Sequence, residues 1–79
     1  MFKKIYKKTF ISLDEIIDFI KNDVYILNIE VDFDVDKSIK ICYYMYVLMD
    51  KKEYKLIFFK SEDTNKIYME DVLEIDNEN

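Results

Sequence analysis

The chain has 79 residues, of which 51% are hydrophobic, and it carries a formal net charge of −5. It contains no Gly, Pro, Ala, Arg, His, Trp or Gln. These absences exclude Gly-rich phosphate loops, imidazole bases and Arg clamps for phosphate. The same amino-acid composition is typical of proteins from an AT-rich bacterium or its phages. The length fits a single domain over residues 1–79, and the hydrophobic content is too high for intrinsic disorder.

The first eleven residues carry four lysines and no acidic residue, so the rest of the chain is strongly acidic. The lysines do not precede an uninterrupted apolar segment of the kind found in signal peptides. No segment approaches the roughly 20 apolar residues of a membrane span. We therefore expect a cytoplasmic protein without a membrane partner, in the host cytoplasm if a phage encodes it. Its acidity disfavours direct binding to nucleic acid and favours basic partners.

The N-terminal segment 2–11 fits two structures. The spacing of Phe2, Ile5, Tyr6 and Phe10 suits a helix. We expect a strand over Lys4–Ile11, because this segment runs directly into the start of a predicted helix.

That helix is predicted over residues 12–22. Ser12 and Glu15 form a capping box, in which each side chain can satisfy a backbone N–H of the other residue. Ile11 can pack on Ile16 as a hydrophobic staple. Apolar residues at i, i+3, i+4 and i+7 predict one buried stripe, made by Leu13, Ile16, Ile17 and Ile20.

From residue 25 the hydrophobic period changes to two, which predicts strands over 25–36 and 38–49. The odd-numbered residues, among them Tyr25 and Leu27, form the apolar side of the first strand. If Asp34 lies opposite Ser38, apolar residues pair with apolar ones, and Asp32 lies opposite Lys40.

A turn near residues 50–53 leads to a third strand over 53–60, with Met45 opposite Phe58. A short strand over 66–69 and the segment 70–75 follow. The predicted fold is α+β, with an antiparallel sheet of four to five strands and the helix packed on one face. Because two short strands around a tight turn close several small barrels, an SH3-like barrel with an added helix is the alternative.

Four acidic residues share one side of the first strand: Glu30, Asp32, Asp34 and Asp36. Alternate residues lie roughly 6.6–6.8 Å apart, comparable to successive phosphates, so this row could occupy a basic groove made for nucleic acid. The D-x-D-x-D pattern also resembles the start of a calcium-binding EF-hand loop. Lys37 and Tyr43 replace the Gly and Glu that such a loop needs, so we expect no metal and no cofactor.

Tyr44, Tyr46 and Phe59 lie on the side opposite the predicted core strip. Such a side is too apolar to be left in water, so we expect the helix, barrel closure, a second copy or a partner to cover it. Cys42 has no histidine to activate it and is expected to be a small structural hydrophobe in a reducing compartment. We therefore expect no enzymatic activity.

In its small size, acidity and amino-acid composition, the chain resembles the small acidic inhibitors of phages and mobile elements, anti-CRISPR proteins among them. The resemblance concerns general character and rests on no motif. It implies a non-enzymatic protein that occupies a basic surface of a host nucleic-acid-handling protein, such as a CRISPR effector or another nuclease. The alternative is a self-associating structural or accessory subunit, a homodimer formed through the surface of Tyr44, Tyr46 and Phe59.

Overall fold

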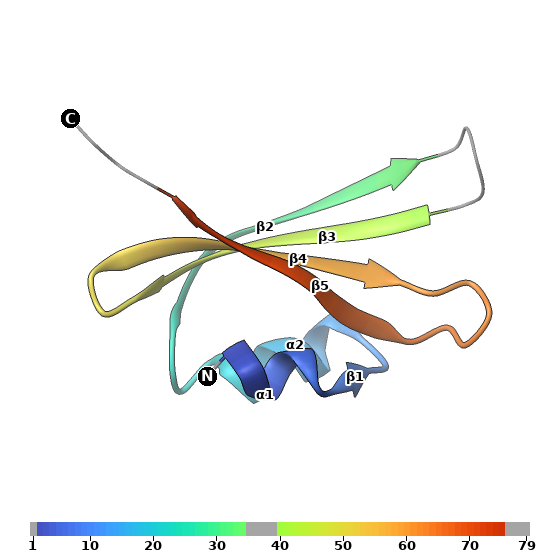
Figure 1. The fold of residues 1–79 in the computed structure, drawn as a ribbon, viewed down its shortest axis with the longest axis horizontal. Helices are drawn as coiled ribbons and strands as arrows, with labels where there is room; N and C mark the ends of the chain where they lie inside the picture. The colour runs from blue at the N-terminus through green and yellow to red at the C-terminus, as the bar shows by residue number, and fades with distance from the viewer. Residues whose placement is uncertain (1, 35–39, 76–79) are drawn as a thin grey trace.

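The computed structural model describes residues 2–34 and 40–75 (Figure 1). Two short helices and a two-residue strand are followed by four longer strands. In chain order the elements are α1 (Phe2–Tyr6), β1 (Thr9–Phe10), α2 (Leu13–Ile20), β2 (Tyr25–Asp34), β3 (Lys40–Met49), β4 (Lys52–Lys60) and β5 (Ile67–Ile75).

The strands form one antiparallel sheet in the order β1-β5-β4-β3-β2. Figure 1 shows both helices on the same side of this sheet, and their buried residues join those of the strands in one core. The predicted α+β fold is confirmed. The barrel alternative is wrong, because β1 and β2 lie at opposite edges of the sheet and do not pair with each other in the described chain.

Helix α2 forms as its sequence predicts, although it is shorter. The Ser12 side-chain oxygen accepts a hydrogen bond from the Glu15 N–H at 3.2 Å, which satisfies one free donor of the first turn. Ile16 and Ile20 are fully buried. The helix ends at Ile20 rather than at residue 22, and Ile11 remains 72% exposed, so Ile11 adds little to the buried surface.

The expected strand over Lys4–Ile11 is wrong for most of its length. Residues 2–6 form α1, because helical spacing places Phe2 and Ile5 on one side, against the sheet. Ile5 is fully buried. The rings of Phe2 and Tyr54 meet edge to face, with their centroids 5.0 Å apart. Only β1 adopts the expected extended form, and it pairs with the start of β5.

The two long hairpins keep the predicted sides but not the predicted pairs. Asp34 lies opposite Lys40, two positions from the expected Ser38, and Asp32 lies opposite Cys42. Met45 likewise lies opposite Leu56 instead of Phe58. A shift of two residues leaves every side chain on its own side of the sheet, so the hydrophobic pattern does not distinguish these registers.

The turn between β3 and β4 is formed by Asp50 and Lys51. Their φ angles are 52° and 66°, and two positive φ values in a two-residue loop are the feature of the type I′ turn that suits the twist of a hairpin. This turn normally contains Gly or Asn, and the chain has no Gly to mark it.

Two bulges change which side chains face outward. One lies at Leu27 in β2, so Ile26 pairs with Val47, whereas Tyr25 is 71% exposed rather than part of the core. The other lies at Glu70, inside β5. β5 is one strand over Ile67–Ile75, in place of the expected short strand and separate segment.

Replacing Ile16 or Ile20 with Ala should lower the free energy of unfolding by about 2–5 kcal/mol, because either change leaves a cavity in the core. Urea denaturation measures this loss. The matched control Ile11→Ala removes the same atoms from an exposed side chain and should change stability by less than about 0.5 kcal/mol. Equal urea midpoints for all three variants would contradict the packing of α2 on the sheet.

Candidate functional site

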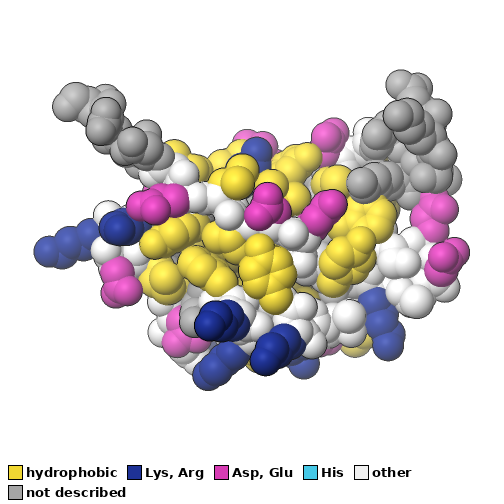
Figure 2. Space-filling view, in the orientation of Figure 1, with side chains coloured by type: hydrophobic (Ala, Val, Ile, Leu, Met, Phe, Trp, Pro, Cys, Tyr) yellow, Lys and Arg dark blue, Asp and Glu magenta, His cyan; other side chains and the backbone are white. Residues whose placement is uncertain are grey.

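The side of the sheet opposite the helices has no helix over it in the described chain. We call this surface the open face; it consists of the side chains of β2 to β5 that point away from the helices. Its centre is hydrophobic and is formed by Tyr44, Tyr46, Ile57, Phe59, Tyr68 and Leu73. Figure 2 shows hydrophobic side chains gathered over the strands in this way. Tyr68 and Leu73 are exposed and the other four side chains are half-buried. Apolar side chains that remain partly in contact with water together are typical of an interaction site.

Ring contacts order the centre of the open face. Phe59 lies opposite Tyr68 in the sheet, and their rings meet edge to face with centroids 5.4 Å apart. The Lys55 Nζ atom lies 4.4 Å from the centre of the Tyr44 ring and 5.8 Å from that of Tyr46. These cation–π contacts place the lysine stem across the two tyrosines.

Carboxylates surround this centre. Glu30 lies opposite Tyr44, and Asp32 lies opposite Cys42, so both project from the edge strand β2 beside the aromatic rings. Glu53 and Asp71 also belong to the open face, because each lies opposite an outward-facing residue of the neighbouring strand. Among the open-face side chains that the structure describes, Lys55 is the one opposing positive charge. The open face is therefore a net acidic surface with a hydrophobic centre.

The side chain of Tyr44 links the acidic and aromatic parts of the open face. Burial raises the pKa of its phenol most, and electrostatic interactions with Cys42 and Asp32 raise it further, because nearby negative charge disfavours a phenolate. The Tyr44 hydroxyl thus lies beside Asp32 of β2 and is held in its neutral form to higher pH than an ordinary phenol.

Five of the residues predicted for partner binding lie on this one surface: Glu30, Asp32, Tyr44, Tyr46 and Phe59. Asp34 is placed by its backbone, at the end of β2 opposite Lys40, and Asp36 lies outside the described residues. No group of three or more metal-ligating side chains occurs in residues 2–34 and 40–75.

Sequence reasoning missed several members of the open face. Asp71 and Leu73 point outward because the bulge at Glu70 reverses the alternation of β5, and no sequence signal marks that bulge. Lys55 could have been found, since it alternates with Ile57 and Phe59 along the same strand.

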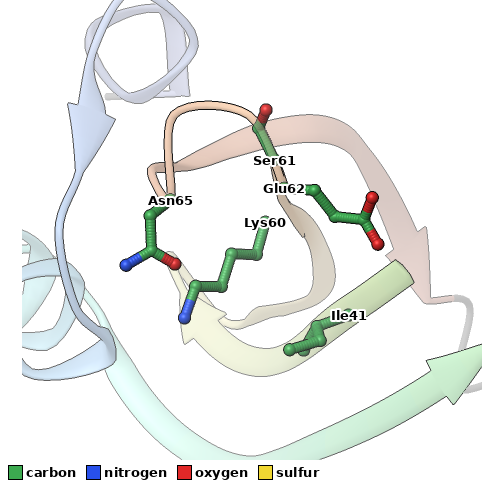
Figure 3. A pocket seen from close by; sticks show the side chains of 5 residues that line it. All are labelled: Ile41, Lys60, Ser61, Glu62 and Asn65. Atoms are coloured by element: carbon green, nitrogen blue, oxygen red, sulfur yellow. The ribbon is translucent and has the colours of Figure 1, made fainter. Parts of the chain in front are cut away.

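A cavity of about 250 Å³ lies at the C-terminal end of β4 (Figure 3). It is lined by Ile41, Lys60, Ser61, Glu62 and Asn65. The Lys60 and Glu62 side chains point in different directions there. Four of the five lining residues are polar or charged, but none of them is buried, so water competes with a small ligand for their hydrogen bonds. The open face is the stronger candidate.

Comparison with known proteins gives no significant match to a protein-family model, a curated protein or a solved structure. Within the described residues, no helix is long and apolar enough to cross a membrane.

The raised pKa of Tyr44 predicts a loss of stability at high pH. The unfolded chain gives up the phenol proton near the ordinary value of about 10, whereas the folded protein holds it to higher pH, so stability falls as pH rises above about 10. Tyr44→Phe should make this fall shallower, as measured by urea denaturation between about pH 9 and pH 11. A slope for Tyr44→Phe equal to that of the wild type would contradict the assigned environment of Tyr44.

Proposed function

We propose that this protein acts by binding, without catalysis, and that its open face contacts a basic surface on a partner protein. The observation that supports this best is that Glu30 and Asp32 lie on the same surface as Tyr44 and Tyr46, and that the helices leave this surface uncovered. Aromatic side chains provide large contact areas at interfaces, and surrounding charges steer association. The open face combines both.

The partner class follows from charge and spacing. Glu30 and Asp32 are successive outward residues of one strand and are both exposed, so their carboxylates form the start of a linear acidic row. A groove that binds nucleic-acid phosphates presents the complementary row of basic groups. The proposed partner is therefore a nucleic-acid-handling protein, such as a nuclease or CRISPR effector, whose basic groove the open face occupies as an inhibitor.

The test uses three immobilised proteins and a lysate of the source cells or their host. They are the wild type, the double variant Glu30→Gln, Asp32→Asn, and the control Asp23→Asn, Asp63→Asn, which removes equal charge from loops outside the open face. Wild type and control should retain the same protein, whereas the double variant should lose most of it. With that protein purified, the double variant should associate about threefold to tenfold more slowly at low salt and with weaker salt dependence.

Equal capture and equal salt dependence for all three proteins would show that the acids of β2 are only solvated. Tyr44→Ala with Tyr46→Ala then tests the aromatic part of the open face. A complex that survives both pairs of substitutions would contradict the proposal altogether.

A further inference from the structure

The free edge of β2 differs from the other edge of the sheet. β5 is protected: β1 pairs with its first residues, the bulge at Glu70 makes its pairing with β4 irregular, and the Asp71 carboxylate accepts a hydrogen bond from the Val72 N–H at 2.8 Å. Beyond its bulge at Leu27, β2 pairs regularly with β3 over residues 28–34, and no described strand pairs with its outer side. Alternate backbone N–H and C=O groups of this stretch therefore face outward without a strand partner.

The two sides of the same stretch have different chemistry. On the open face, Glu30 and Asp32 are exposed. On the helix side, Val31 and Phe33 are 47% and 61% exposed, because this end of the β2–β3 hairpin extends beyond the helices (Figure 1). A strand added to this edge would place alternate residues beside the acids and the others beside the apolar pair.

We infer that β2 binds an extended segment of its partner by strand addition, and that this segment alternates basic with apolar residues. The inference rests on the proposed function and specifies how the partner is held. Basic side chains of the segment pair with Glu30 and Asp32, apolar ones cover Val31 and Phe33, and backbone hydrogen bonds join the two strands. A second copy of this chain fits less well, because two β2 strands paired antiparallel about Val31 would set Glu30 opposite Asp32.

The probe is a synthetic peptide of about seven residues in which Lys alternates with Val, and it is added to ¹⁵N-labelled protein at low salt. The control peptide has the same composition, with all Lys residues before all Val residues, so it cannot present the two kinds on opposite sides of a strand. Amide hydrogen exchange measured by NMR reports whether the outward N–H groups of residues 28–34 become paired.

The alternating peptide should slow exchange at alternate residues of 28–34, and the control peptide should not. Glu30→Gln with Asp32→Asn should weaken binding of the alternating peptide roughly two- to thirtyfold, because two cross-strand ion pairs are lost. Asp23→Asn with Asp63→Asn should leave it unchanged.

Binding of both peptides to the open face without slower exchange at 28–34 would overturn strand addition and leave the proposed acidic binding surface intact. Failure of both peptides to bind would also overturn strand addition, and capture from the lysate would then decide the proposed function separately.

Discussion

The helices are too short to cover even their own side of the sheet, and the exposure of β2 follows from that mismatch. α2 has 8 residues and is about 12 Å long, whereas β3 has 10 residues and extends about 33 Å. The fully buried strand residues accordingly come from β1 and from the middle of the sheet, in β3, β4 and β5, and β2 contributes none. Pairing with β3 holds β2 in place, while its side chains remain largely in contact with water.

This one-sided burial separates the residues that stabilise the fold from the acids of β2. The side chains that stabilise the fold are Ile, Leu, Val, Met and Phe residues on the helix side, and none of them is charged. The acids Glu30 and Asp32 of β2 lie on the other side of the sheet and are exposed. β2 can therefore carry a charged row on one side and exposed Val31 and Phe33 on the other without weakening the core. A small domain with a limited core can leave one side of its sheet in contact with water in this way.

Hydrophobic periodicity predicted the helix, the three long strands through residue 60, and the sides on which Tyr44, Tyr46, Glu30 and Asp32 lie. It did not predict the registers, because a shift of two residues leaves every side chain on the same side of the sheet. The bulges at Leu27 and Glu70 also escaped prediction, so Tyr25 and Asp71 point opposite to the simple alternation. In a chain without Gly or Pro, turns and bulges have few sequence markers, and helix α1 is fixed by its contact with the distant Tyr54.

The proposed function requires that the open face and the edge of β2 be free to contact a different protein and not be covered by a second copy. Size-exclusion chromatography with light scattering, from micromolar to near-millimolar protein at low salt, measures whether they are. We expect the mass of one chain, 9.7 kDa, throughout this range, because carboxylates surround the hydrophobic centre and repel a second acidic copy. A dimer at micromolar concentration that Tyr44→Ala with Tyr46→Ala converts to a monomer would show instead that a second copy covers the open face.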